Sequence, residues 1–291
     1  QTQLLTCNMI SLLSLAESAR KFKYCRPHLV NENILEIVKG RHPLQELCVD
    51  IFVANDIKIA ENVDNDSATS SAYKSIMLLS GANYSGKSVY LKQVALITYM
   101  AHIGSFVPAD SATIGLTTKF LLVCRQEKLY PIIKCCDTIF TNSSKIQSAF
   151  MIDLQQISIA LRNSTSRSLL IFDEFGKGTG STDGAGLFCG VIEHLLKRGR
   201  DCPKVIAATH FHGKFTFFGI YNDRNFRKQS SPSSIAYFIG HNERRIGLSI
   251  SVRNIEIINF FVLSLVPGRS TTSWGTFCAA FAGMPSHIVK R

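Results

Sequence analysis

The sequence predicts an α/β protein whose mainly parallel sheet is covered by helices. The prediction rests first on three compact apolar segments typical of buried strands, Ser75–Leu79, Ser168–Phe172 and Val205–Ala208. It rests also on helical periodicity at Lys87–His102, after the first strand, and at Leu187–Lys197, between the other two. Strands that alternate with helices favour parallel pairing, because each helix returns the chain across the sheet.

The other elements are predicted from shorter patterns. Apolar residues recur on one broad face of a helix that begins at Met9 and that Pro27 stops. In chain order we expect a helix at Met9–Lys23, strands at Ile34–Val38, Val49–Val53 and Ile57–Ile59, an antiparallel pair at Ser234–Ile239 and Ile246–Val252, a strand at Ile257–Val266, and a helix at Thr276–Lys290 that Gly283 and Pro285 interrupt.

Length and composition exclude a disordered chain. The chain has 291 residues, of which 46% are hydrophobic and 18% charged. Disorder needs low apolar content and high charge, so a large buried core is expected. The length suits one large α/β domain with an appendage, or two small domains.

The net charge favours a polyanionic partner without naming it. Lys and Arg number 32 against 21 Asp and Glu, which leaves a formal charge of +11. Nucleic acid, phosphate ligands and an anionic membrane all fit such a charge, and so does an ordinary basic protein with scattered lysines. The most apolar stretch, Ile255–Val266, is about half the ~20 residues that a membrane span requires. We therefore expect no membrane partner.

The nine cysteines carry no metal-binding pattern. No Cys-x-x-Cys occurs in the sequence, which argues against a zinc ribbon. Several cysteines lie inside apolar runs, and their number is odd. These features favour reduced, buried thiols in an intracellular protein.

A phosphate-binding loop follows the first buried strand. The pattern G-x-x-x-x-G-K-[ST] is matched by eight consecutive residues, namely Gly81, Ala82, Asn83, Tyr84, Ser85, Gly86, Lys87 and Ser88. Backbone N–H groups of such a loop and the helix N-terminus behind it face the phosphates. Lys87 is expected to reach the β- and γ-phosphates of ATP, and Ser88 to bind Mg²⁺. The alternative is a Gly-rich turn that matches by chance.

Two acidic residues end the second buried strand, where ligands of parallel sheets bind. Asp173 is expected to hold Mg²⁺ through its water shell, and Glu174 to act as the general base on the attacking water. The alternative, a plain loop start, is weakened by the phosphate loop upstream. His210 follows the third strand and is placed to bond the γ-phosphate and the water. A packing or surface role is the alternative for His210, and it is the interpretation we give His42 and His212.

The order of these motifs resembles the C-terminal ATPase domain of the MutS family, DNA mismatch-recognition and recombination ATPases of the ABC class. The resemblance covers roughly residues 9–291. The motifs are, in family order, Arg41–Leu44, Gly81–Ser88, Gly104–Ala109, Phe150–Leu154, Asp173–Thr179 and Ala208–His210. The fourth and fifth of these, FMIDL and DEFGKGT, look most like the family's meiotic branch, the fifth eukaryotic MutS homologue.

The resemblance implies further roles and partners. Phe52 matches the aromatic residue that stacks on adenine, Asn83 the loop residue near the γ-phosphate, and Ser148 the serine that reaches the partner's nucleotide across a dimer. The family works as dimers with two composite ATP sites and closes a clamp around DNA. Its meiotic branch pairs with the fourth MutS homologue on branched recombination intermediates, which implies a nuclear, chromosomal protein.

The resemblance also divides the chain. Residues 1–30 are expected to be the end of the helical lever region, and residues 31–291 a P-loop NTPase domain of the ABC type. Residues 116–136 form an atypical insertion relative to the family, for which a retained intron or a gene-model error is one hypothesis. The dimerising C-terminal region is expected to be truncated. The alternatives left open are a catalytically impaired ATP-binding fragment and another ABC-class ATPase, such as a transporter ATPase, although no Leu-Ser-Gly-Gly-Gln signature is found.

Overall fold

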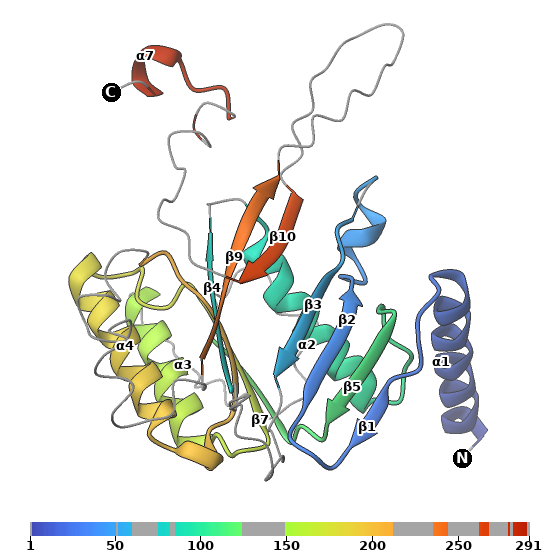
Figure 1. The fold of residues 1–291 in the computed structure, drawn as a ribbon. Helices are drawn as coiled ribbons and strands as arrows, with labels where there is room; N and C mark the ends of the chain where they lie inside the picture. Colours follow the sequence, from blue (N-terminus) through green and yellow to red (C-terminus); the bar gives the residue numbers. More distant parts are fainter. Residues whose placement is uncertain are drawn as a thin grey trace, which may run out of the picture.

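The fold is a mixed α/β arrangement of two sheets. The computed structural model describes residues 2–50, 52–59, 75–81, 85–123, 149–211, 235–243, 262–267, 279 and 282–289. Within them a six-stranded sheet and a four-stranded sheet lie on either side of one helix (Figure 1). The predicted α/β class with a mainly parallel sheet is confirmed.

The larger sheet is parallel except at one edge. Its strands in spatial order are β10 (Val262–Pro267), β9 (Ile235–Glu243), β4 (Ile76–Gly81), β8 (Lys204–Ala208), β7 (Ser168–Asp173) and β6 (Lys119–Val123). Only β10 and β9 pair antiparallel. Strand β8 therefore has a parallel neighbour on each side, which is typical of a sheet buried on both faces.

The smaller sheet is mixed. Its strands in spatial order are β1 (His28–Val30), β5 (Ser111–Gly115), β2 (Leu35–Gly40) and β3 (Asn55–Ile59). Strand β2 pairs antiparallel with both of its neighbours, and β1 pairs parallel with β5. The buried side chains of this sheet belong to a core that it shares with the helix between the two sheets. They include Leu35, Ile37, Ile57 and Ile59.

Three helices cover the larger sheet. Helix α2 (Lys87–His102) packs on the face that carries Met77 and Leu79 of β4, in the core shared with the smaller sheet. Helices α3 (Ala149–Asn163) and α4 (Ser181–Leu196) pack on the opposite face, with Ile76 and Leu78. Because successive strand residues point to opposite faces, the continuous apolar run of β4 supplies both cores.

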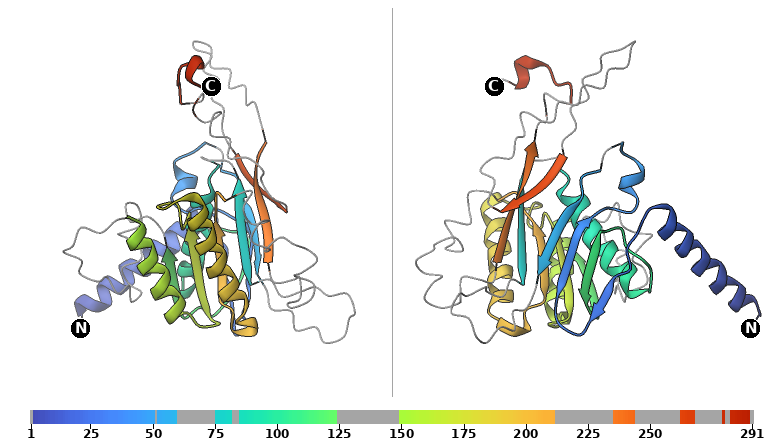
Figure 2. Two further views of the ribbon diagram at one scale, coloured as in Figure 1. Left: turned by 90° about the vertical axis from the view of Figure 1, so that its left-hand side faces the viewer. Right: turned by 45° about the vertical axis from the view of Figure 1, so that its right-hand side comes forward.

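Helix α1 (Thr2–Lys21) extends away from the body (Figure 2). The segment after it forms an isolated bridge between Cys25 and Val107, and the guanidinium of Arg41 donates to the carbonyl of Phe22 at 3.1 Å. Several apolar side chains of α1 are exposed, among them Met9 at 71%. The last described helix is α7 (Ser286–Val289), and the short 3-10 turns η1 (Gln45–Leu47) and η2 (Gly199–Asp201) complete the elements. None of the helices in the described ranges has the length and apolar character of a membrane span.

Two strand predictions need correction. The strand predicted at Val49–Val53 is wrong for its described residues, because the chain is still turning after η1 and pairing with β2 begins only where Asn55 meets Gly40. The antiparallel partner of β9 is β10, whereas the predicted partner, residues 246–252, lies outside the described residues. The structure adds α3, β1, β5 and β6, which were not predicted, and β6 lies within the expected insertion at residues 116–136.

Helix α4 begins six residues before its predicted start. Its first turn includes Gly184, which is in close contact with the loop that precedes the helix. A Cβ atom on Gly184 would overlap the carbonyl oxygen of Gly176, in the loop that precedes the helix. A side chain at position 184 would therefore separate the helix from that loop. The buried residues Ala185, Phe188 and Ile192 hold the same helix on the sheet.

We predict that Gly184→Ala destabilises the protein by about 1–3 kcal/mol, because the added methyl group meets backbone that cannot rotate away. The matched control is Gly190→Ala on the same helix, where a Cβ would meet nothing within 4 Å. That change should stabilise the protein by about 0.5–1 kcal/mol, through helix propensity alone. Urea unfolding of both variants measures the two free energies, and equal effects would contradict the contact.

Candidate functional site

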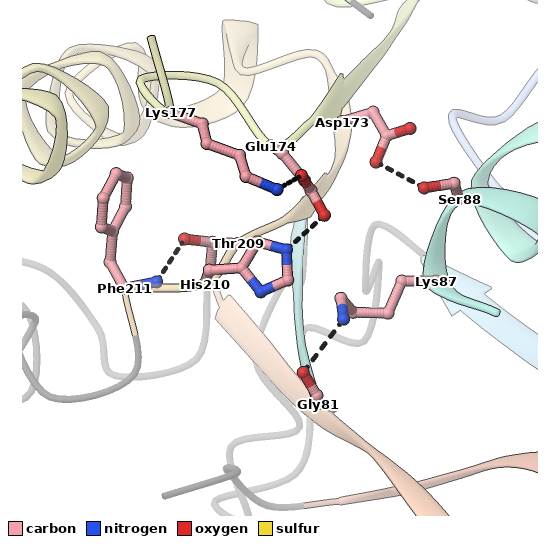
Figure 3. Close-up of polar contacts among 9 residues, drawn as sticks. All are labelled: Gly81, Lys87, Ser88, Asp173, Glu174, Lys177, Thr209, His210 and Phe211. Atoms are coloured by element: carbon pink, nitrogen blue, oxygen red, sulfur yellow. Dashed lines mark hydrogen bonds and ion pairs between the residues drawn. The ribbon is translucent and has the colours of Figure 1, made fainter. Parts of the chain in front are cut away.

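Three parallel strands end side by side at one edge of the larger sheet. Ala208, the last residue of β8, is opposite Leu79 of β4 and opposite Asp173 of β7. The segments that follow these strands contain the predicted site residues. Figure 3 shows their side chains converging from the start of α2 and from the ends of β7 and β8. Ligands of parallel sheets bind at this edge.

The phosphate loop connects β4 to α2 as predicted. Gly86 is the N-cap of α2 and has φ of 92°, in the left-handed region that favours glycine. The ammonium group of Lys87 is buried and donates to the carbonyl oxygen of Gly81 at 3.0 Å, so it reaches back to the first residue of the loop. The predictions for Ala82, Asn83 and Tyr84 stay predictions, because these residues lie outside the described ones.

The buried hydroxyl of Ser85 fits an anionic ligand. Within the described part of the chain, its Oγ atom has no hydrogen-bond partner, although Ser85 is only 2% exposed. A buried hydroxyl without a partner costs free energy, which a bound acceptor would recover. Because the hydroxyl stands just before the N-terminus of a 16-residue helix, a phosphate oxygen is the acceptor that best fits the local field.

Ser88 and Asp173 meet across the site. The hydroxyl of Ser88 donates to Oδ1 of Asp173 at 3.0 Å and so joins the first turn of α2 to the end of β7. Burial raises the pKa of Asp173, the bond from Ser88 lowers it, and the neighbouring charge of Glu174 raises it again. Within the described ranges no group of three or more His, Cys, Asp or Glu side chains could hold a metal. A hydroxyl and one carboxylate are nevertheless a donor set that suits Mg²⁺ bound together with phosphates.

Glu174 is held from its backbone and from both carboxylate oxygens. Its φ is 59°, which is uncommon for a residue other than glycine, and its N–H donates to the carbonyl of Ala208 at 3.1 Å. Nε2 of His210 contacts Oε1, and the ammonium of Lys177 contacts Oε2 at 2.8 Å (Figure 3). The bond to His210 contributes most to lowering the pKa of Glu174 to about 2, burial opposes it, and the bond from Lys177 adds to it.

The segment after β8 places His210. Thr209 donates its N–H to the carbonyl of Leu79 at 3.0 Å, and its hydroxyl accepts the N–H of Phe211 at 3.2 Å. The ring of Phe211 packs against Phe188 of α4, with centroids 6.4 Å apart. These contacts fix the backbone on both sides of His210, whose side chain is 19% exposed and meets Glu174.

The other predicted residues are placed only in part. Phe52 is half-buried in the segment before β3, and β3 itself is hydrogen-bonded to α2 and to β10. Tyr90 of α2 donates to the carbonyl of Asp56 at 3.0 Å, and the Asn55 side chain accepts the N–H of Leu265 at 2.9 Å. Ser148 and His212 lie outside the described residues.

His42 has the packing role predicted for it. It is buried, and its Nδ1 accepts the backbone N–H groups of Leu44 and Gln45, both at 3.2 Å. The residue that sequence reasoning missed is Lys177. It lies within the DEFGKGT motif, three residues after Glu174, but only the turn at Gly176 brings the two side chains together.

Fold and site together define a nucleotide-phosphate-binding domain of the P-loop class, with a hydroxyl, two acids and a histidine around the loop. Residues 77–223 match the family described as MutS domain V. The chain is also similar to the DNA mismatch repair protein MutS of Porphyromonas gingivalis, with 34% identity over 96% of this chain and 27% of that protein. It is 33% identical to MutS protein homolog 5 of Saccharomyces cerevisiae, over 100% of this chain and 31% of that protein.

The chain therefore belongs to the MutS family, as its motifs predicted. It spans less than a third of the length of these two relatives. The bacterial and the yeast relatives are about equally identical to it, so overall identity does not separate the mismatch-repair branch from the other. Because the chain belongs to the MutS family, the alternative of a transporter-type ATPase is no longer supported.

The lowered pKa of Glu174 predicts a pH-dependent stability. Its carboxylate stabilises the folded state above the unfolded pKa of about 4.5, and this stability is lost as the pH falls toward 2. Compared with Glu174→Gln, the unmodified chain should therefore lose about 1–2 kcal/mol more of its free energy of unfolding between pH 6 and pH 3.

Urea unfolding at several pH values measures this difference. The control is Glu193→Gln, whose ion pair with Lys197 joins side chains that are 59% and 73% exposed. Water screens such a pair, so this variant should follow the unmodified chain across the range. If the free energies of unfolding of Glu174→Gln and the unmodified chain changed equally with pH, the folded state would not be stabilising the ionised form of Glu174.

Proposed function

We propose that the chain is the ATP-binding and ATP-hydrolysing domain of a MutS homologue that acts on mismatched or branched DNA. One observation supports this most: the hydrogen bond of 3.0 Å between Ser88 and Asp173, which joins the phosphate loop to the acidic strand end. These are the two protein groups that a P-loop ATPase needs around its metal. The reaction is transfer of the terminal phosphoryl group of ATP to water, which yields ADP and phosphate.

Binding of the phosphates is proposed for Gly81–Ser88. The ammonium of Lys87 already lies at the loop and would exchange the neutral carbonyl of Gly81 for the more strongly attracting phosphate oxygens. The hydroxyl of Ser85 and the N-terminus of α2 supply further donors. Phe52 is proposed to stack on the adenine ring and Asn83 to lie at the γ-phosphate, as the family resemblance implies.

Ser88 and Asp173 are proposed to hold Mg²⁺, which when bound with ATP neutralises charge that develops on the transferred group. Ser88 would bind through its hydroxyl oxygen and Asp173 through water. The bond between them shows that both side chains face the same space. The buried carboxylate of Asp173 gains from a cation, because burial alone disfavours its charge.

Glu174 is proposed as the general base and His210 as its partner. Glu174 would orient the attacking water and accept its proton, and a positioned carboxylate of this kind contributes about 10²–10⁴-fold to a rate. His210 contacts Oε1 of Glu174 directly, which places the imidazole where it can also reach the water or the γ-phosphate. Positioning and electrostatics, rather than covalent chemistry, then lower the barrier.

The wider assignment follows the family. We propose an ABC-type ATPase domain over residues 31–291, with residues 1–30, which include most of α1, as the end of a lever region and residues 116–136 as an insertion. Two such domains would form composite sites, with Ser148 reaching the partner's nucleotide. The likeness to MutS protein homolog 5 of yeast supports a nuclear role in meiotic recombination, with the fourth MutS homologue as partner. DNA would be contacted mainly by the rest of the longer protein.

We predict that Glu174→Gln preserves ATP affinity and lowers steady-state turnover by about 10²-fold or more, because glutamine keeps the shape of the side chain and cannot accept a proton. Phosphate release and ATP binding are measured on the same preparations. Glu193→Gln, a change of the same kind on the exposed face of α4, serves as the control and should be fully active. Full turnover by Glu174→Gln would remove Glu174 from the mechanism.

We predict that Lys87→Ala weakens ATP binding by about tenfold or more, because a charge-assisted contact to phosphate is lost. Binding of a fluorescent ATP analogue measures the change, and urea unfolding confirms that the variant is folded. The control is Lys197→Ala, since Lys197 is the C-cap residue of α4, has a side chain that is 73% exposed and pairs with Glu193 at 2.8 Å. Equal affinity of Lys87→Ala and the unmodified chain would refute the loop assignment.

A further inference from the structure

We propose that Lys177 is a positioning residue for this reaction, whose ammonium group fixes the carboxylate of Glu174 in its working orientation. The inference rests on the ATP hydrolysis proposed above and extends it to a residue that has no role there. Lys177 does not need to touch nucleotide or water for this purpose. It acts through Glu174, whose Oε2 atom it contacts at 2.8 Å.

The plane of a carboxylate is fixed only when both of its oxygens are held. A carboxylate held at one oxygen can still rotate about its last side-chain bond, whose torsional preference is broad. His210 contacts Oε1 of Glu174, and Lys177 contacts Oε2 (Figure 3). With both oxygens engaged from different segments of the chain, the plane of the carboxylate is fixed.

The backbone that carries Lys177 is held in place by its neighbours. Glycines flank it on both sides, and each is in close contact with a helix. Gly176 has φ of +87°, and a Cβ there would lie 2.7 Å from the carbonyl oxygen of Gly184 in α4. A Cβ on Gly178 would lie 3.0 Å from the Cβ of Phe150 in α3. The tripeptide is therefore confined between two helices, so the direction of the Lys177 side chain is set by the fold.

The pair of Lys177 and Glu174 differs from an ordinary surface ion pair. Lys197 and Glu193 also meet at 2.8 Å, but their side chains are 73% and 59% exposed. In the pair of Lys177 and Glu174 the lysine is 51% exposed but the carboxylate only 25%, and the backbone of Glu174 is in the left-handed region. An exposed pair contributes little, whereas a carboxylate held in an unusual backbone conformation depends more on its remaining contacts.

The test compares Lys177→Met, which keeps the length and removes the charge, with Lys177→Arg, which keeps the charge. Steady-state ATP turnover by the full chain should fall about 10- to 100-fold in Lys177→Met, because a misplaced catalytic group loses its near-attack geometry. KM and the equilibrium affinity for ATP should stay within about twofold, since the contact involves no nucleotide. Lys177→Arg should recover most of the turnover, and the control Lys197→Met should be fully active.

Three results would overturn the inference. The first is unchanged or higher turnover by Lys177→Met. The second is a loss of turnover matched by an equal loss of ATP affinity, which would make Lys177 a nucleotide ligand. The third is a crystal structure of Lys177→Met in which Glu174 keeps its orientation on His210. An inactive unmodified chain that still binds ATP would instead refute the proposed hydrolysis, and this inference with it.

Discussion

The site depends on the parallel register of β8 with its two neighbours. Ala208 stands opposite both Leu79 and Asp173, so the phosphate loop, the acidic pair and His210 all leave the sheet at one level. The N–H of Glu174 and the N–H of Thr209 then bond across the strand ends, to Ala208 and Leu79. A shift of β8 by one residue would break these bonds and turn its buried side chains to the opposite face. Core packing and site geometry are therefore fixed by the same pairing.

The sequence predicted best the parts whose signals are local. Strands β4, β7 and β8 are continuous apolar runs, and the phosphate loop fixes the start of α2 at Lys87, so these elements were found nearly to the residue. In the smaller sheet β2 and β3 were predicted, whereas β1 and β5 were missed, because both are short and their pairing joins distant segments of the chain. Helix α4 was begun too late because Gly184 weakens the helical pattern, while its contact with Gly176 is visible only in three dimensions.

The same distinction explains the predictions for the site. Lys87, Ser88, Asp173, Glu174 and His210 follow motifs, and the structure brings them together. Lys177 is in a motif too, but a lysine three residues after a glutamate suggests a helical surface pair. Here the chain turns at Gly176, which has a positive φ, and the turn brings Lys177 to Glu174 at the edge of the site. The backbone conformation at Gly176 decides whether the two residues form a helical surface pair or a contact at the site, and the sequence alone does not reveal that conformation.

The surroundings of the adjacent acids Asp173 and Glu174 shift their pKa values in opposite directions. Burial raises the pKa of Asp173, and the partner that the structure gives its Oδ1 atom is the neutral hydroxyl of Ser88. Glu174, the next residue, contacts His210 and Lys177, and its pKa falls to about 2. Neighbouring carboxylates whose environments push their pKa values apart are suited to different tasks. Asp173 gains most from an added cation, which supports its proposed role at the metal. Glu174 already has a cationic partner in the protein, which keeps it ionised and oriented for the proposed work on water.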